Sequence, residues 1–249
     1  QVATALEVIQ NVALEINLPR PSAVTDGGQD LAGRALQILK TAGNRLKKKD
    51  WPELIYEHEF FLKKNQPYYD LPEDYDRFVQ GTGWDRVESR PLTPLNAQQW
   101  QEWKSGLVQA EVWKQYRVKG VDGARKIFIN PTPSTTQCTF ETRDGKKVKV
   151  GLVVEYYSKW WVESSAGQGK AAPTAGTDVI RLPSDLIEAE LKWRWLRSLS
   201  RPYADEKFEA ESLCEQLLAQ SGLPETLDAG LTTRGLSHPN IPETNVGLS

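Results

Sequence analysis

The hydrophobic period of the chain changes twice along its length, and these changes restrict the folds that the sequence can adopt. Near both ends, apolar residues recur every three or four positions, which is the period of an amphipathic α-helix. In the middle they recur every second position over short segments bounded by glycine, proline and aspartate, which is typical of β-strands. This order predicts an α+β fold: a helical bundle of two N-terminal and two C-terminal helices, with an antiparallel β-sheet or sandwich-like insertion in the middle.

The same periods divide the chain into predicted helices and domains. Leu6, Ile9 and Ala13 fall at helical spacing and mark the first helix. The predicted helices cover about residues 4–17, 30–48, 184–200 and 202–222. The predicted domains are an N-terminal helical part at 1–50, a β-rich middle domain at 51–183 with a flexible loop at 164–178, a C-terminal helical hairpin at 184–221 and an extended C-terminal arm at 222–249.

Period-two segments predict the strands of the middle domain. They cover about residues 54–62, 68–70, 116–119, 126–130, 137–143 and 146–163. Asp144-Gly145 predicts a hairpin between the last two, because glycine takes the positive φ that a tight hairpin turn needs. Pro72 favours a single helical turn over residues 72–78, since proline suits the first turn of a helix. His58 falls on the apolar face of the first strand, which predicts a hydrogen-bonded core or interface histidine.

Composition and charge exclude several classes of protein. The chain has 249 residues, of which 39% are apolar and 26% charged, so we expect a soluble protein with a real core. A net charge of -2 gives no general attraction to nucleic acid or to an anionic membrane. Because no apolar run approaches about 20 residues and Glu7 and Glu15 interrupt the N-terminal helix pattern, neither a membrane span nor a signal peptide is expected. Cys138 and Cys214 lie far apart, which indicates reduced thiols in a protein made in a cytosol.

Few residues are suited to catalysis. His58 and His238 are the two histidines, and the chain contains no Gly-x-Ser-x-Gly, P-loop, dinucleotide-binding or His-Glu-x-x-His motif. The sequence therefore predicts no enzyme activity, no cofactor and no metal site. Carboxylates between residues 57 and 76 leave a hydrolase as an alternative, in which loss of Glu73 or Asp76 would abolish activity.

The tryptophans have two interpretations. Trp160, Trp161, Trp193 and Trp195 could form a platform that stacks on sugars or bases, or they could belong to a core and an interface. The predicted helix at 184–200 is apolar on more than one side, which indicates burial both inside a domain and against something else. Its apolar residues are Leu186, Ile187, Leu191, Trp193, Trp195 and Leu196. This pattern favours oligomerisation or partner docking.

The last two predicted helices carry opposite charges. Basic residues of the first are Lys192, Arg194, Arg197 and Arg201, and acidic residues of the second are Asp205, Glu206, Glu209, Glu211 and Glu215. These faces either match within one antiparallel hairpin or meet between neighbouring subunits of a ring. The residues predicted for a subunit interface are Trp193, Arg194, Trp195, Arg197, Arg201, Glu206, Glu209 and Glu211.

Two segments lack periodicity. The segment 164–178 is rich in small residues and is predicted to be ordered only by a partner. The segment 222–249 is predicted to fold on another molecule or not at all.

Several collinear segments resemble the head-to-tail adaptor (connector) family of tailed bacteriophages. They are NVALEINLPRP at 11–21, DWP at 50–52, YDLPEDYDRF at 69–78, WDR at 84–86, RPL at 90–92, IFINPTP at 127–133, EYYSK at 155–159 and LKWRWLR at 191–197. Their common order makes the resemblance specific over about residues 5 to 215.

The resemblance implies a structural virion protein of the neck, made in the host bacterial cytoplasm, without enzymatic activity. Members of the family form a ring, commonly of twelve copies, below the portal protein, extend the DNA channel and offer a surface to the tail. In that family the C-terminal segment often docks on the portal, which assigns docking to Leu223, Leu227, Leu231, Leu236, Ile241 and Val246. The loop residues Gly167, Gln168, Lys170 and Thr174 are then expected to contact a tail nozzle, a tail tube or the next neck ring.

Viral double-stranded DNA is expected to pass through without sequence-specific binding, and no membrane partner is expected. The alternative that the aromatic residues leave open is a carbohydrate- or host-surface-binding module of the phage tail.

Overall fold

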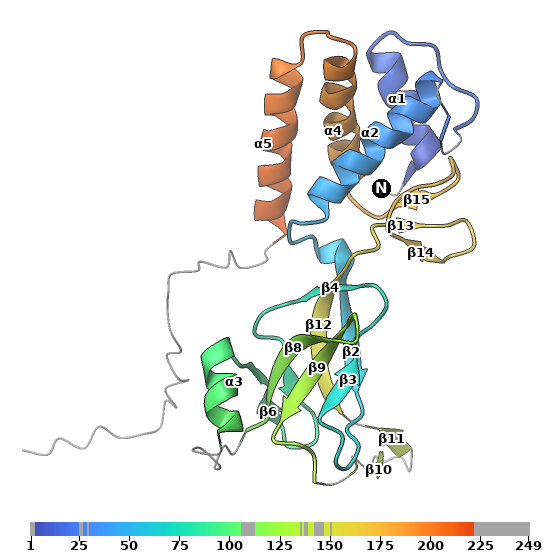
Figure 1. Cartoon of the computed structure of the whole chain (residues 1–249). Coiled ribbons are helices and arrows are strands. Elements are labelled where there is room, and N and C mark those ends of the chain that lie inside the picture. The colour runs from blue at the N-terminus through green and yellow to red at the C-terminus, as the bar shows by residue number, and fades with distance from the viewer. Residues whose placement is uncertain are drawn as a thin grey trace, which may run out of the picture.

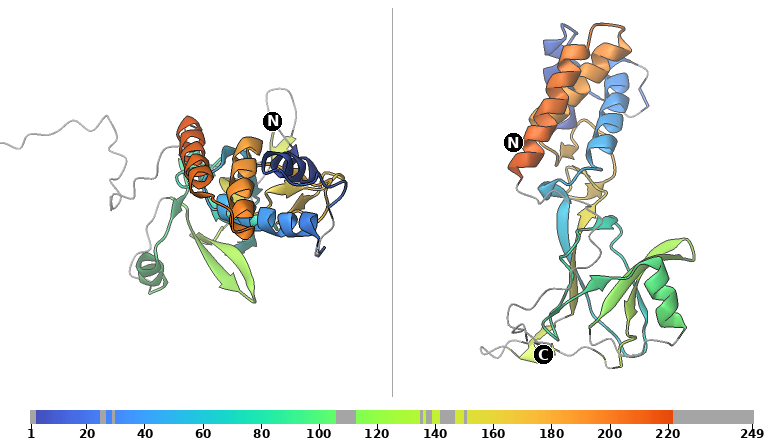
Figure 2. Two further views of the ribbon diagram at one scale, coloured as in Figure 1. Left: turned by 90° about the horizontal axis from the view of Figure 1, so that it is seen from above. Right: turned by 90° about the vertical axis from the view of Figure 1, so that its left-hand side faces the viewer.

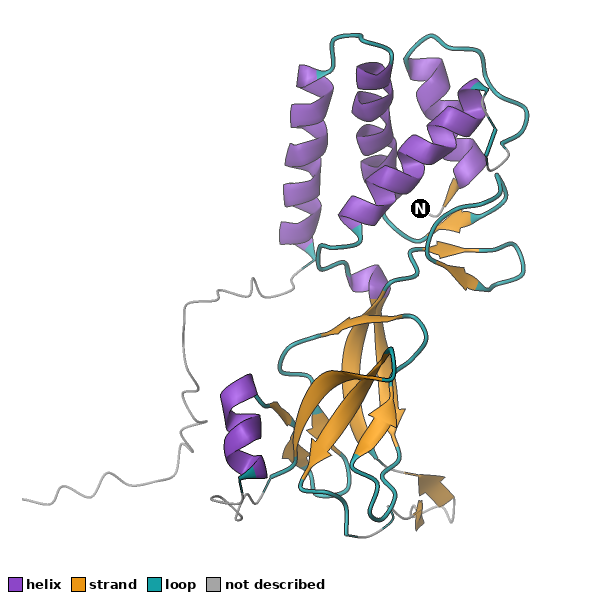
Figure 3. Cartoon of the chain, in the orientation of Figure 1, coloured by secondary structure: helices purple, strands orange, loops and turns teal. Residues whose placement is uncertain are grey.

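The protein has a helical half and a β-rich half, which lie one above the other in Figure 1. The computed structural model describes residues 3–24, 27–28, 30–105, 113–134, 136, 139–141, 147–149 and 151–221. Figure 3 shows most helices in one half and most strands in the other, with α3 (Ala97–Lys104) beside the strands and a few short strands beside the helices. The predicted α+β fold is confirmed.

Four helices form the helical half, close to the predicted positions. They are α1 (Ala5–Glu15), α2 (Leu31–Leu46), α4 (Ser184–Ser198) and α5 (Ala204–Gln220). A capping box starts α1: the Thr4 hydroxyl accepts a hydrogen bond from the Glu7 N–H at 3.2 Å, and the Glu7 carboxylate accepts one from the Thr4 N–H at 2.8 Å. Asp30 caps α2 by accepting a hydrogen bond from the Gly33 N–H at 2.9 Å.

A small sheet completes the core of the helical half. Its strands are β1 (Ala3–Thr4), β13 (Val162–Glu163), β14 (Gly169–Lys170) and β15 (Val179–Ile180), in the order β1-β15-β13-β14. Trp161, Val162, Ile180 and Leu182 are buried in one cluster with α1, α2 and α4. These residues therefore pack with the helices, whereas the predicted middle domain, which extends to residue 183, includes them. The division into domains remains a prediction.

Two sheets form the β-rich half, and their strand pairs are antiparallel except for the parallel pair of β7 and β8. The first sheet has the order β2-β12-β5-β6, with β4 also paired to β12, and the second has the order β3-β9-β8-β7. The strands of the first sheet are β2 (Ile55–Phe60), β4 (Tyr75–Phe78), β5 (Trp84–Asp85), β6 (Arg90–Pro91) and β12 (Leu152–Ser158). Those of the second are β3 (Tyr68–Asp70), β7 (Thr93–Pro94), β8 (Gln115–Val121) and β9 (Ala124–Asn130).

Smaller elements surround these layers. Helix α3 (Ala97–Lys104) accompanies the second sheet, and the single-turn helix η1 (Pro52–Leu54) leads into β2. Strands β10 (Thr139–Glu141) and β11 (Lys147–Lys149) pair with each other as a separate antiparallel ribbon.

A second hydrophobic core lies between the two sheets. Leu152 lies opposite Phe60 in the first sheet, and Tyr116 lies opposite Ile129 in the second, and all four side chains are buried in one cluster. Because side chains alternate along a strand, the residues between them point to the outer faces of the two layers. His58 is on the inner side, opposite Val154 and half-buried, where burial lowers its pKa.

One predicted element is wrong. Residues 72–78 do not form a helical turn, because Tyr75–Phe78 is strand β4. Phe78 pairs with Tyr156 of β12, and the Tyr75 ring centroid lies 6.1 Å from that of Tyr156. Pairing with a distant strand therefore outweighs the local signal of Pro72.

The long strand predicted at 146–163 is divided into β11, β12 and β13. Its strict alternation also fails, because Val153 and Tyr157 are buried as well as their inward neighbours. The predicted hairpin turn at Asp144-Gly145 lies outside the described residues, although β10 and β11 on either side of it are antiparallel.

Polar contacts join the two halves. Arg77 of β4 donates a hydrogen bond to the Lys49 carbonyl at 3.1 Å and pairs with Asp50 at 2.7 Å, just after α2. Arg181, which follows β15, donates to the Tyr56 hydroxyl of β2 at 2.6 Å. Strands β4 and β2 of the β-rich half are thus bonded to residues 49–50 and to Arg181, which belong to the two segments that connect the halves.

Candidate assembly surfaces

Helix α4 is buried on two sides within the chain itself. It contacts α1 and α2 on one side and α5 on another. Leu191 and Trp195 lie in the core of the helical half, while α5 buries Ala210 and Cys214. Helix α4 is therefore buried on two sides, as predicted, but its second side packs against α5 of the same chain.

Trp193 is held at the corner between α4 and α5. Its indole stacks on Tyr203, with ring centroids 6.1 Å apart, and its N–H donates a hydrogen bond to the Glu190 carboxylate at 3.1 Å. The Arg194 guanidinium pairs with the same carboxylate at 2.7 Å and lies 4.2 Å from the Trp193 ring centroid. Since Trp193 and Trp195 are both buried, neither ring is presented at the surface of the single chain.

The basic residues of α4 interact with α1 and with α4 itself in the described part of the chain. Lys192 pairs with Glu15 at 3.1 Å, and Arg201, beyond the end of α4, donates to the Ile16 carbonyl at 2.7 Å. Arg197 is exposed. The cations of this segment therefore strengthen the bundle, and a matched charged face between α4 and α5 is not formed among these residues.

The outer side of α5 is acidic. Glu209 and Glu211 are exposed and Glu206 is half-buried. Phe208 lies among them with 75% of its surface exposed, a residue that the sequence-based interface prediction missed. Because Phe208 is two positions from the buried Ala210, it lies on nearly the opposite side of the helix, and this phase was the signal available in the sequence. The role of these residues between subunits stays a prediction.

The segment 164–178 is held within the chain. Lys170 pairs with Asp178 at 2.8 Å and donates to the Thr174 hydroxyl at 2.9 Å. The buried Asp178 carboxylate also accepts hydrogen bonds from the N–H groups of Thr174 and Ala175 at 2.7 and 3.0 Å. Burial alone would raise the pKa of Asp178, but Lys170 and these N–H groups hold it below its usual value. The expectation that this loop orders only against a partner is therefore wrong.

The tip of the same loop remains accessible. Gly167 and Gln168 are exposed, and the Ser164 N–H donates to the Gln168 carbonyl at 2.7 Å across the turn. A contact between this tip and a tail component stays a prediction.

The carboxylates between residues 57 and 76 do not form a catalytic pair. Glu57 pairs with Arg86 at 2.9 Å, and Asp76 pairs with Arg77 at 2.8 Å. Asp74 accepts a hydrogen bond from the Tyr156 hydroxyl at 2.9 Å. Glu57, Asp74 and Asp76 thus each have a structural partner.

The tryptophans of the alternative binding platform are also not gathered at a surface. Trp161 and Trp195 are fully buried, Trp193 is buried, and Trp160 is half-buried. Among the side chains whose exposure the structure describes, Trp84 and Trp113 are the exposed tryptophans, and both lie in the β-rich half.

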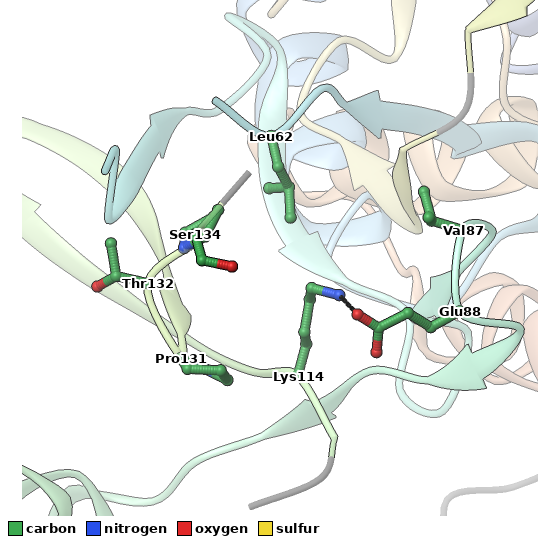
Figure 4. Close-up of a pocket in the computed structure, with 8 residues that line it drawn as sticks. Leu62, Val87, Glu88, Lys114, Pro131, Thr132 and Ser134 are labelled. Atoms are coloured by element: carbon green, nitrogen blue, oxygen red, sulfur yellow. Dashed lines mark hydrogen bonds and ion pairs between the residues drawn. The ribbon is translucent and has the colours of Figure 1, made fainter. Parts of the chain in front are cut away.

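Two hollows among the described residues are lined partly by polar side chains. The smaller one, of about 140 Å³, lies beside Lys114, which bonds to Glu88 as Figure 4 shows and also to the buried Asp85. The larger one, of about 490 Å³, lies between the first turns of α1 and α4, where Asn11 donates to Glu188 at 2.9 Å.

Neither metal sites nor membrane spans are found in the part of the chain that the structure describes. Within that part, no three histidine, cysteine, aspartate or glutamate side chains are grouped so that they could hold a metal ion. None of the helices described there is both long and apolar enough to cross a membrane.

The chain as a whole matches a known family of phage structural proteins. The sequence model of the SU10 adaptor protein family matches residues 3–235, which is nearly the full length. The chain therefore belongs to the SU10 adaptor protein family, and it is a phage adaptor protein, a structural component of the virion that associates with other head and tail components. No curated protein matches the chain.

Proposed function

We propose that the protein is a head-to-tail adaptor that forms a ring beneath the portal protein. The ring, commonly of twelve copies in the family that the sequence resembles, extends the DNA channel and gives the tail a surface on which to attach. The match to the adaptor family over residues 3–235 carries this proposal. The exposed acidic side of α5, with Phe208 at its centre, supports it because a ring subunit needs surface that only a neighbour covers.

The charge of the chain suits a channel. Because the net charge is -2, a ring of these subunits has no overall cationic attraction to DNA, and the genome can slide through without sequence-specific binding. The loop tip at Gly167 and Gln168 is the surface that we assign to the distal partner, which is a tail nozzle, a tail tube or the next neck ring.

The C-terminal arm is the segment that we assign to the portal. Its apolar residues at 223, 227, 231, 236, 241 and 246 lie outside the described residues. Arms that fold only on docking allow subunits to add late and in order, since binding then includes the free-energy cost of ordering the arm.

Native mass spectrometry of the purified protein, alone and mixed with its portal, tests the ring. We expect a monomer of 28.1 kDa that becomes a defined multimer on the portal. A protein that stays monomeric in the presence of the portal would overturn the proposed function.

A chain that ends at residue 221 tests the portal assignment separately. We expect this chain to melt at the temperature of the full protein but not to bind the portal. A full-length control retains the arm but replaces its apolar residues with serine, namely Leu223, Leu227, Leu231, Leu236, Ile241 and Val246. Normal portal binding by both variants would refute the docking assignment.

A further inference from the structure

The outer face of the first sheet of the β-rich half is acidic. Glu57 of β2 lies directly opposite Glu155 of β12, and Glu59 lies opposite Val153. Phe60 of β2 and Leu152 and Val154 of β12 face the core between the sheets. The glutamates alternate with them along the two strands, so they point to the other side of the sheet. Arg86 is the cation that joins them, at 2.9 Å from Glu57 and 3.8 Å from Glu59. We call this surface the acidic face, defined by Glu57, Glu59 and Glu155. Arg77, opposite Tyr157 on the same side of the sheet, already pairs with Asp50 and Asp76.

The outer face of the second sheet is basic. Lys119 of β8 lies directly opposite Lys126 of β9, and Arg117 lies opposite Phe128. Lys126 pairs with the exposed Asp70 at 3.1 Å. We call this the basic face, defined by Arg117, Lys119 and Lys126, whose three cations face one carboxylate.

Each face contains a pair of like charges at directly opposite positions, and in each pair one member has an ion-pair partner within the chain: Glu57 has Arg86 and Lys126 has Asp70. Residues directly opposite in antiparallel strands have Cβ atoms about 5 Å apart, and like charges there are destabilising. Glu57 and Glu155 form such a pair on one face, and Lys119 and Lys126 form one on the other. Burial, together with the nearby charges of Arg117 and Lys104, lowers the pKa of Lys119. An opposing surface of the other sign would add a counter-charge to the second member of each pair, Glu155 on one face and Lys119 on the other.

Both faces also carry aromatic side chains of the kind that anchors interfaces. Trp84 lies opposite Val153 on the acidic face, and 45% of its surface is exposed. Tyr68 lies opposite Phe128 on the basic face with 39% exposed. Trp100 of α3 is buried on the part of this face around Phe128, with Lys119 at 4.2 Å from its ring centroid, so α3 covers that part and the rest, with Tyr68 and Lys126, is open to a partner. Aromatic and arginine side chains are the residues most enriched at the centres of interfaces.

The two faces point in opposite directions. In the right view of Figure 2, β8, β9 and α3 stand to one side of β2 and β12, and the shared core lies between the layers. A surface on one side that matches a surface on the other side of the next copy gives a heterologous contact, the type that closes into rings.

We propose that the acidic face of one subunit binds the basic face of the next, so that the β-rich halves carry a head-to-tail contact of the ring. This inference rests on the proposed function for the existence of the ring, and it adds which surfaces meet and why. The partner of each face is a second copy of this chain, because the two faces carry opposite charges and each has an exposed aromatic side chain.

Charge reversal on each face provides the test. One variant is Glu57→Lys with Glu155→Lys, which makes both faces basic, and the other is Lys119→Glu with Lys126→Glu, which makes both faces acidic. We expect each variant alone to lose the multimer on the portal. An equimolar mixture should recover it, because the two variants then alternate around the ring. Lys63→Glu with Lys64→Glu, two exposed lysines between β2 and β3, is the matched control and should assemble normally.

The outcomes separate the two proposals. Wild-type protein that never forms a multimer on the portal contradicts the proposed function. If wild-type protein assembles and both reversed variants assemble equally well, the ring stands and the assignment of these faces is wrong. If each variant fails and the mixture also fails although thermal melts show all chains folded, the pairing of the two faces is refuted as well.

Discussion

Gly43→Ala is expected to destabilise the protein although the substitution improves a helix. Gly43 lies inside α2 and is buried against the six-membered ring of Trp161. A Cβ at this position would overlap three carbons of that ring, namely Cη2, Cζ2 and Cζ3. Trp161 has no exposed surface, so its ring cannot move toward solvent.

The magnitude follows from two opposing terms. Alanine in place of glycine within a helix gains about 1 kcal/mol from backbone propensity. Overpacking of a well-packed core costs about 1–3 kcal/mol and occasionally more, and an overlap with three ring atoms of Trp161 belongs at the upper end. We therefore expect a net loss of about 2 kcal/mol. For a protein of this size, that loss lowers Tm by about 4–8 °C.

Thermal unfolding followed by circular dichroism measures this loss. Gly120→Ala is the matched control, because no atom lies within 4 Å of a Cβ placed there, and its Tm should change by less than about 2 °C. Trp161→Phe removes the overlapping atoms, so Gly43→Ala should cost far less in that background. If the Gly43→Ala variant melts at or above the temperature of the wild type, the inference that Gly43 packs tightly against Trp161 is refuted.

Three further changes test separate contacts. Asp178→Asn should lower stability by roughly 1.5–3 kcal/mol at pH 7, since it removes a buried carboxylate bonded to Lys170. The pKa of Asp178 is lower in the folded than in the unfolded protein. Its contribution to the free energy of unfolding is therefore complete above the unfolded pKa of about 3.9 and is lost as the pH falls through the folded pKa. Melts of both proteins at pH 7 and pH 3 should therefore show a smaller difference at pH 3. Arg77→Ala should cost roughly 1 kcal/mol and expose the connection at Asp50 to limited proteolysis, as its ion pair is half-exposed. Phe208→Ser should leave Tm unchanged within about 2 °C but weaken assembly on the portal, because the ring is exposed in the single chain.

The sequence predicts the helices well, and the reason is local. The pattern at 4–17 becomes α1 (Ala5–Glu15), and that at 30–48 becomes α2 (Leu31–Leu46), since a long apolar stripe with caps specifies both its type and its ends. The strands of the middle domain follow for the same reason wherever the period of two is clear, as in β8 (Gln115–Val121) and β9 (Ala124–Asn130).

The failures of the sequence-based predictions are all cases in which a distant segment decides. Strand β4 forms because it pairs with β12 about 80 positions away, and no local pattern shows that partner. The loop at 164–178 is fixed by the buried Asp178 and by two-residue strands, which are too short to have a period. Trp193 is covered by Tyr203 only because α5 folds back on α4.

Surface charge shows the same dependence on distant pairing, with a consequence for assembly. Glu57 and Glu155 are neighbours only through the register of β2 and β12, and the net charge of -2 conceals both this pair and the lysine pair on the opposite side. Two copies in solution therefore repel each other weakly at long range, while attraction between the faces acts only within about 8 Å at physiological ionic strength. Such a contact is weak between free monomers and strong only when a template holds neighbours in register. Raising the salt concentration should accordingly release subunits from the portal at concentrations that leave the melting temperature of the monomer unchanged.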